Sequence, residues 1–199
     1  MTDHYFSSDG ADYSAEVIRV PLAGSERELE APRGVFSSDG LDTGTSVLLR
    51  VAPEAPTVGN LLDIGCGWGP ITLDLALSSP EATVWAVDVN PLALEATARN
   101  ARRLSLPNVR TALPEDVPAD VRFDAIWSNP PIRIGKSALH VLLDTWLDRL
   151  TPEGEAWLVV QKHLGSDSLQ RWLDERPGFW AERAESKKNF RILRTGRSA

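Results

Sequence analysis

An amide side chain followed by two prolines stands directly after an apolar segment, in the stretch WSNPP at 127–131. The residues that lead into it, FDAIW at 123–127, have the composition of a buried strand. Proline donates no backbone N–H and fixes φ near −65°, so the loop cannot extend the strand and is rigid. A rigid loop at the end of a strand is suited to hold the Asn129 side chain in one place for a ligand.

A glycine-rich turn follows an earlier apolar run, in the segment DIGCGWGP at 63–70. Glycines at alternate positions, Gly65, Gly67 and Gly69, let the backbone turn sharply and let a ligand approach without a Cβ in the way. Asp88 ends the next apolar run along the chain. From there a carboxylate can bind the hydroxyl pair of a ribose, as in nucleotide-binding α/β proteins.

These residues fit S-adenosylmethionine better than a nicotinamide dinucleotide. The dinucleotide fingerprint has the spacing G-x-G-x-x-G, which leaves a helix N-terminus free for a pyrophosphate. Here the spacing is G-x-G-x-G, and Asp63 precedes it. A carboxylate beside the turn would repel a pyrophosphate but suits a ligand that carries an ammonium and a sulfonium group. We therefore expect S-adenosylmethionine as the cofactor.

The order of apolar runs predicts how these residues come together. From residue 58 onward, strand-like runs alternate with helix-like segments, which predicts an α/β fold with a mostly parallel sheet and helices on both faces. Two late strand candidates, 179–185 and 190–195, are joined too closely for a crossover helix, so the sheet is expected to end in an antiparallel pair. Ligands of such sheets bind outside the carboxyl ends of the strands, where the motifs above are expected to meet.

No linker divides the chain, so we expect one domain over 1–199. Its first part, 1–50, is expected to form a small β-hairpin and a helix that starts at an Asp or Thr cap, and 58–199 to form the cofactor-binding core.

The motifs DIGCGWG, VDVN and SNPPI, in this order, resemble class I S-adenosylmethionine-dependent methyltransferases. The chain is more specifically similar to the methyltransferase small domain group, which includes the ribosomal RNA guanine-N2 methyltransferases of the small subunit and stand-alone single-domain relatives. GVFSSDGLDTGTSVLL at 34–49, HYFSSD at 4–9 and RIGK after NPPI carry this closer similarity. The resemblance implies a Rossmann-like sheet and a cofactor pocket, with Asp116 preferred over Glu115 as the contact to the adenine amine. The cofactor-binding residues expected on this basis are Asp63, Gly65, Cys66, Gly67, Gly69, Asp88, Val89, Asp116 and Asn129.

In such an enzyme the Asn-Pro-Pro loop would hold the amine that receives the methyl group. The lone pair of an exocyclic amine is delocalised into its ring, and nitrogen gains positive charge as the methyl group arrives. Two fixed acceptors, the Asn129 side-chain oxygen and the Pro130 carbonyl, can each take one N–H and stabilise that charge. We expect Asn129, Pro130, Pro131 and Ile132 to form the catalytic loop, with no nucleophilic residue.

Ile132 departs from the family pattern, in which many amine methyltransferases carry an aromatic residue that stacks on the target ring. Phe36 is the candidate for that stacking, with Tyr5 and Phe6 as weaker ones. Arg133 and Lys136 are candidates for contacts to a phosphate next to a flipped nucleotide.

The acceptor expected first is an exocyclic base amine in RNA, with guanine N2 of ribosomal RNA or the small ribosomal subunit as the partner. A protein glutamine amide needs the same two acceptors and is the alternative. A third reading is a partner subunit that binds S-adenosylmethionine without turnover.

Composition narrows the class of protein further. The net charge of −7 disfavours a whole-surface nucleic-acid binder. Positive charge collects late, between Lys187 and Arg197, where a solvated hairpin and a phosphate-contacting face are both open readings. A single cysteine excludes a disulfide framework and a cysteine-cluster zinc site, so no metal is expected. No long apolar run or signal-like start is present, so we expect no membrane span and a cytoplasmic location. The sequence does not fix the oligomeric state and leaves a monomer and a weak dimer open.

Overall fold

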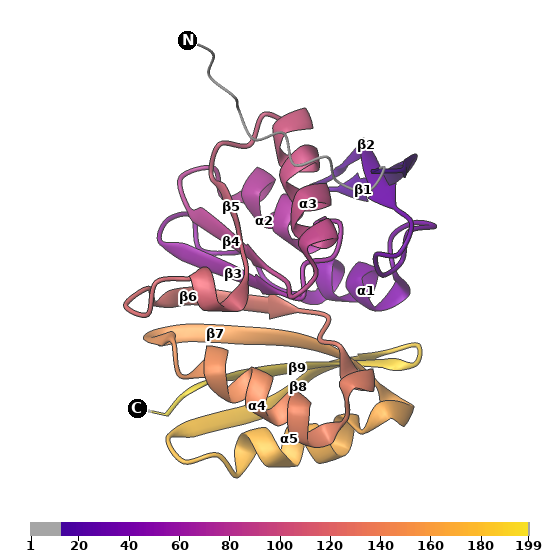
Figure 1. Ribbon diagram of the computed structural model, residues 1–199. Helices are drawn as coiled ribbons and strands as arrows, with labels where there is room; N and C mark the ends of the chain where they lie inside the picture. Colours follow the sequence, from indigo (N-terminus) through magenta and orange to yellow (C-terminus); the bar gives the residue numbers. More distant parts are fainter. Residues whose placement is uncertain (1–12, 199) are drawn as a thin grey trace.

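A seven-stranded sheet forms the centre of the protein, whose computed structural model describes residues 13–198 (Figure 1). The strand order is β5-β4-β3-β6-β7-β9-β8, and β9 runs antiparallel to both of its neighbours while the other pairings are parallel. The expected mostly parallel, Rossmann-like sheet with an antiparallel C-terminal end is therefore confirmed. The strands are β3 Asn60–Ile64, β4 Thr83–Val87, β5 Val109–Ala112, β6 Phe123–Ser128, β7 Leu150–Gln161, β8 Phe179–Lys187 and β9 Phe190–Arg197.

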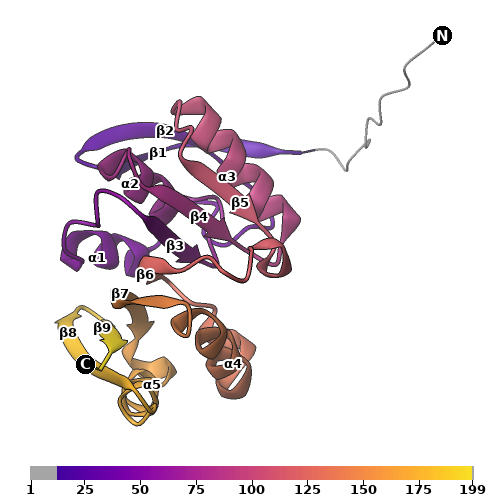
Figure 2. The ribbon, with the colours of Figure 1, turned by 90° about the vertical axis from the view of Figure 1, so that its left-hand side faces the viewer.

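Helices cover both faces of this sheet, as the sequence predicts. Val47 of α1 and Ile71 of α2 pack in one buried cluster with β3, β4, β6, β7 and β9. Leu143 and Trp146 of α4 pack with Leu169 of α5 in a second cluster on the opposite face (Figure 2). The helices are α1 Thr43–Val51, α2 Pro70–Ser78, α3 Pro91–Arg103, α4 Lys136–Leu147 and α5 Ser166–Asp174, and the short 3-10 turns are η1 Pro114–Asp116, η2 Ile132–Ile134 and η3 Lys162–Leu164. Within 13–198, every helix is too short or too polar to cross a membrane.

The expected N-terminal hairpin is present as β1 Ala15–Leu22 and β2 Ser25–Pro32, and it packs against α3 and α2 rather than joining the main sheet. Its turn is tied to α2, because the backbone N–H of Ala23 donates to the Asp74 carboxylate at 2.7 Å. The fully buried Asn100 of α3 fixes the other end: its amide exchanges hydrogen bonds with the backbone of Glu30 at 2.7 and 2.8 Å and donates to the Trp68 carbonyl at 2.9 Å. The hairpin therefore stands against the glycine turn that Trp68 belongs to.

Local sequence sets where the helices next to the site begin. Asp42 caps α1 by accepting from the backbone N–H groups of the residues two and three positions later. Asn90 caps α3, with Pro91 at its first position, where a missing N–H costs nothing. The helix α2 instead starts from Gly69 at φ 97°, and a Cβ there would meet the Thr97 hydroxyl at 2.9 Å, so only glycine fits without a shift.

Candidate active site

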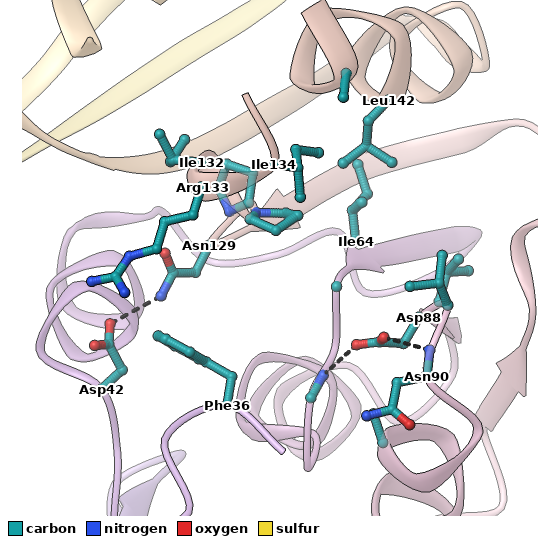
Figure 3. A pocket seen from close by; sticks show the side chains of 18 of the residues that line it. Phe36, Asp42, Ile64, Asp88, Asn90, Asn129, Ile132, Arg133, Ile134 and Leu142 are labelled. Carbon is teal, nitrogen blue, oxygen red and sulfur yellow. Dashed lines mark hydrogen bonds between the residues drawn. The ribbon is translucent and has the colours of Figure 1, made fainter. Parts of the chain in front are cut away.

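The predicted motifs meet at one edge of the sheet, where β3, β4 and β6 end side by side. Ile64 pairs with Val87 at the last register position of β3 and β4. The buried Ser128 hydroxyl at the end of β6 donates to the Ile64 carbonyl at 2.7 Å, which joins the third strand end to the other two. Loops from these ends enclose a cavity of about 690 Å³, a size that accommodates a small-molecule ligand (Figure 3).

Asp88 holds the glycine turn in place. One carboxylate oxygen accepts from the Gly67 N–H at 3.0 Å, and the other accepts from the Asn90 N–H at 2.9 Å (Figure 3). The turn can take this course because Gly65 and Gly67 have φ of 75° and 59°. Asp88 therefore fixes both the turn and the start of α3, and its carboxylate still lines the cavity.

Asp63 lies beneath the turn and does not line the cavity. Its side chain is fully buried, and one oxygen accepts from the Thr72 N–H at 3.0 Å and the Thr72 hydroxyl at 2.7 Å. The other oxygen has no hydrogen-bond partner within the described part of the chain. Burial raises the pKa of Asp63 to about 7, with the nearby Asp88 adding to the shift.

Cys66 is also buried beneath the turn, at 3.5 Å from the Thr97 hydroxyl. Burial raises the pKa of the thiol well above its usual range, so it stays protonated at neutral pH. A protonated, covered thiol is not a nucleophile, in agreement with a reaction that relies on positioning.

The Asn129 side chain is held in one orientation by a residue far away in the sequence. Its amide nitrogen donates to the Asp42 carboxylate at 2.9 Å and to the Thr45 hydroxyl at 3.1 Å (Figure 3). A carboxylate only accepts, so the nitrogen must face Asp42 and the amide oxygen must face the other way. That oxygen accepts no hydrogen bond from residues 13–198 and is available to a donor.

The two prolines form a tight inverse γ-turn. Pro131 has φ −73° and ψ 72°, and the Ile132 N–H donates to the Pro130 carbonyl at 2.8 Å. A carbonyl oxygen has two lone pairs, so the Pro130 oxygen retains one for a further donor. The expected rigidity of the loop therefore has a specific geometry.

The two ends of the cavity differ in character. At the end of the glycine turn, polar groups of Asp88 and Asn90 line it. At the other end, the apolar side chains of Ile132, Ile134 and Leu142 do (Figure 3). A ligand with a polar nucleoside part and a reacting group near Asn129 fits this division.

The cavity brings together most of the predicted residues. Those that line it are Phe36, Gly65, Gly67, Asp88, Val89, Asn129, Pro130, Pro131, Ile132 and Arg133. Those that do not line it are Asp63, Cys66, Gly69, Asp116 and Lys136. Asp116 is exposed, although Pro114 of the same 3-10 turn lines the cavity. The weaker stacking candidates Tyr5 and Phe6 lie outside the described residues.

The structure shows where the side chains of two predicted substrate-binding residues lie. Lys136 opens α4 on the side of His140 and Ser168, where it lines a smaller hollow instead. Phe36 is 68% exposed, and Figure 3 shows its ring pointing from the 33–42 loop toward Asn129.

Sequence reasoning missed Asp42 and Thr45 as parts of the site. The expected Asp or Thr cap of the helix was the available signal, and Asp42 is that cap. A capping role alone did not indicate that the same carboxylate oxygen also binds Asn129.

The surroundings of the glycine turn fit S-adenosylmethionine as a ligand. The turn is lined by the carboxylate of Asp88 rather than by a basic residue. This feature suits a cationic ligand and disfavours a pyrophosphate. Of the residues expected to bind it, Gly65, Gly67, Asp88 and Val89 line the cavity at this turn.

Comparison with known proteins agrees with this fit. The family model of the methyltransferase small domain matches residues 26–194. The uncharacterised protein YbxB of Bacillus subtilis is 33% identical over 179 residues, which cover 88% of this chain and 89% of that protein. Ribosomal RNA small subunit methyltransferase C of Acinetobacter baylyi is 36% identical over 146 residues, or 69% of this chain and 42% of that protein.

Structural comparison shows the same fold. The 16S rRNA N2 methyltransferase of T. thermophilus, in complex with AdoMet and guanosine, superposes with a TM-score of 0.80 at 23% identity, over 94% of this chain and 52% of that one. The chain thus spans about half the length of the ribosomal RNA methyltransferases named here. A family model that spans most of the chain and a relative of matching length establish the assignment: the chain belongs to the methyltransferase small domain family of S-adenosylmethionine-dependent methyltransferases.

Proposed function

We propose that this protein transfers the methyl group of S-adenosylmethionine to an exocyclic amine of an RNA base, with guanine N2 of ribosomal RNA as the first candidate. The orientation of Asn129 carries the proposal, since its NH2 group is engaged by Asp42 and Thr45 and its oxygen is left for a donor. The names of the relatives support an RNA acceptor, and the structural neighbour bound to guanosine supports N2. A ribosomal acceptor would place the reaction in the cytoplasm.

Two acceptors on a rigid loop are what an amine needs for methylation. The Asn129 side-chain oxygen and the free lone pair of the Pro130 carbonyl each accept one N–H of the target NH2 group. With both hydrogens held, the nitrogen lone pair is directed toward the methyl group, which the cofactor supplies as a strong electrophile. The same two dipoles stabilise the positive charge that develops on nitrogen. Pro131 contributes by fixing the turn that aims the Pro130 carbonyl.

The glycine turn and Asp88 form the proposed cofactor side. Each Asp88 oxygen accepts one backbone N–H and keeps lone pairs for the ribose hydroxyls. Asp63 acts indirectly in this proposal, because it fixes the start of α2 from below the turn. Gly69 allows that start, and Cys66 fills the space next to Thr97. Asp116 is exposed outside the cavity, so the adenine contact proposed for it requires η1 to turn toward the cavity.

Phe36 is the proposed ring that stacks on the target base. Ile132 lines the cavity but packs against the main core, so it offers an apolar wall rather than a flat surface. Phe36 is a large exposed side chain directed at Asn129 (Figure 3). Base–aromatic stacking contributes about 1–3 kcal/mol per base.

The test is transfer of labelled methyl from S-adenosylmethionine to unmodified ribosomal RNA, followed by mass spectrometry of the nucleosides. We expect N2-methylguanosine from the wild-type protein and only a small residual rate of its formation by Asn129→Ala, with cofactor affinity by isothermal titration unchanged. Equal transfer by the variant would refute the role of Asn129. Loss of cofactor binding in the variant would leave the lost transfer unassigned, so Asn129→Asp, which keeps the oxygen but adds charge, is measured beside it.

A protein glutamine amide is the second candidate acceptor. It needs the same two hydrogen-bond acceptors, and the apolar end of the cavity at Ile134 and Leu142 suits the methylene groups of a glutamine. The exposed aromatic ring of Phe36 favours a planar base instead. Label in the protein fraction of a cell extract, and none in its RNA fraction, would decide for the amide.

A further inference from the structure

All four lysines of the chain lie on segments at the same edge of the sheet as the cavity. Lys136 opens α4 directly after the Asn-Pro-Pro loop, and Lys162 opens η3 directly after β7. Lys187 is the last residue of β8, and Lys188 lies in the turn between β8 and β9. Because β7 is parallel to β6 and β9 is antiparallel to β7, this turn lies at the same edge of the sheet as the carboxyl ends of β6 and β7, on the right of Figure 1.

These lysine segments are continuous with the wall of the cavity. The Lys162 N–H donates to the Asn189 carbonyl at 2.8 Å, which joins η3 to the β8–β9 turn. The cavity is lined by Gln161 and Leu164 on either side of Lys162, and by Phe190, two positions after Lys188. With Arg133 of η2, the lysines form a group at this edge that we call the lysine rim, defined as Arg133, Lys136, Lys162, Lys187 and Lys188.

The basic residues later in the chain are used differently. Arg194 forms ion pairs with Glu155 and Glu182, and Arg191 pairs with Asp167. Arg197 donates to the carbonyls of Leu150 and Asp148. These arginines stabilise the sheet and are not free for a ligand.

The lysine rim keeps its charge unpaired. Within residues 13–198, no carboxylate lies within 4.0 Å of any of its five cations. Lys187 and Lys188 are exposed at the turn, and Arg133 is exposed at the mouth of the cavity. A protein of net charge −7 thus concentrates unpaired positive charge beside its cavity.

We propose that the lysine rim binds the phosphates of the RNA strand that flanks the target nucleotide; this inference rests on the RNA acceptor proposed above. Lysine suits this task, because its flexible stem carries a point charge that follows a phosphate backbone without reading sequence. The position of the rim sets the path of the strand. It crosses the carboxyl ends of β6 and β7 and the amino end of β9, and the glycine turn on the other side of the cavity has no lysine and is left to the cofactor.

The salt dependence of RNA binding tests the rim without relying on methylation. The full-length protein is titrated into a short fluorescein-labelled single-stranded RNA of mixed sequence, with fluorescence anisotropy read between about 50 and 200 mM salt. For single strands, log Kobs falls with log salt by about 0.7 per phosphate neutralised. The double variant Lys187→Gln/Lys188→Gln is therefore expected to reduce the magnitude of the slope by about 1.4 and to weaken binding about tenfold or more near 0.1 M salt.

A second rim variant and a matched control complete the design. Lys136→Gln/Lys162→Gln is expected to reduce the slope by a similar amount. Arg102→Gln/Arg110→Gln makes the same change in net charge at exposed positions at the end of α3 and in β5, away from the cavity. The control is expected to keep the wild-type slope.

The outcomes separate the rim from the proposed function. An unchanged slope in both rim variants, or an equal fall in the control, overturns the rim, whether or not the wild-type protein methylates RNA. Failure of the proposed function appears separately, as absence of methylated nucleosides with wild-type protein. Rim variants that lose methyl transfer to a protein fraction while keeping RNA affinity would also overturn the inference, in favour of an acidic protein substrate.

Discussion

Replacing Asp42 with serine separates two tasks of one carboxylate. The same oxygen of Asp42 accepts from the N–H groups of Gly44 at 2.7 Å and Thr45 at 3.1 Å, which caps α1, and from the Asn129 amide at 2.9 Å. Serine is as good a helix cap as aspartate. Its side chain is shorter by one bond and carries no charge, so Asp42→Ser keeps the cap and loses the hydrogen bond to Asn129.

The size of the effect follows from the bond that is lost. A hydrogen bond to a charged group contributes about 1.5–3 kcal/mol. If that bond holds the Asn129 amide ready for the transition state, its loss lowers kcat about 10- to 150-fold, at 1.36 kcal/mol per tenfold. Cofactor affinity should not change, because the cofactor is proposed to bind at the glycine turn. The Thr45 hydroxyl still holds the amide at 3.1 Å, so Asp42→Ser/Thr45→Val should be slower than Asp42→Ser.

The assay is initial-rate methyl transfer to RNA, with cofactor affinity and thermal unfolding measured on the same samples. Asp42→Ala is the control for stability, since loss of the cap costs about 0.5–2 kcal/mol in addition. In the background of Asn129→Ala, Asp42→Ser should cause no further loss of rate if it acts only through Asn129. A kcat within twofold of wild type would refute the positioning role, and a further loss in the Asn129→Ala background would show that Asp42 contacts the substrate directly.

Three further predictions concern stability and substrate. Burial raises the pKa of Asp63 from 3.8 to about 7, so the folded state keeps a proton that the unfolded chain loses. The free energy of unfolding therefore falls as pH rises from about 4 to about 7. In melting curves, the Tm of Asp63→Asn relative to wild type should therefore rise between about pH 5 and about pH 8, and a constant difference would contradict the shift. Gly69→Ala should lower the free energy of unfolding by about 2–4 kcal/mol in denaturant titrations, because the residue has a φ of 97° and the new Cβ would meet Thr97. Gly135→Ala should lower it by only about 1–2 kcal/mol, because Gly135 has a similar φ of 96° but open space around it. Phe36→Leu should raise the KM for RNA about 5- to 150-fold through lost stacking while Phe36→Tyr keeps it, and equal KM values for both variants would remove Phe36 from the substrate site.

The sequence was informative wherever a feature is local. Alternating apolar runs predicted the parallel sheet, and the close spacing of the last two strands predicted their antiparallel pairing. The sequence also predicted that three motifs meet at one edge of the sheet, since parallel strands bring their carboxyl ends together. These motifs are the alternate glycines, Asp88 and the Asn-Pro-Pro loop, and residues of all three line the cavity.

Contacts between distant segments were out of reach of that reasoning. Asp42 and Asn129 are 87 positions apart, and no pattern in either segment specifies the other. Asp63 was expected beside the ligand, but a residue one position before the end of a central strand can face the helix layer instead, and Thr72 of α2 donates two hydrogen bonds to its carboxylate. The sequence did not show which of the late basic residues are paired with acidic ones. Arg194 pairs with Glu155, which lies on β7, and only the strand order of the sheet makes β7 the neighbour of β9.

The segment at 33–42 connects the two halves of the site. The Trp68 side chain, fully buried within the glycine turn, donates from its indole nitrogen to the Ser37 carbonyl at 3.1 Å, so the segment is fixed to the proposed cofactor side. Its last residue, Asp42, orients Asn129 on the proposed acceptor side, and Phe36 projects into the cavity between them. The segment at 33–42 therefore contacts both the glycine turn and the Asn-Pro-Pro loop. A fragment that begins at α1 would lack the Asp42 carboxylate that orients Asn129, so we expect its Asn129 amide to be less well ordered.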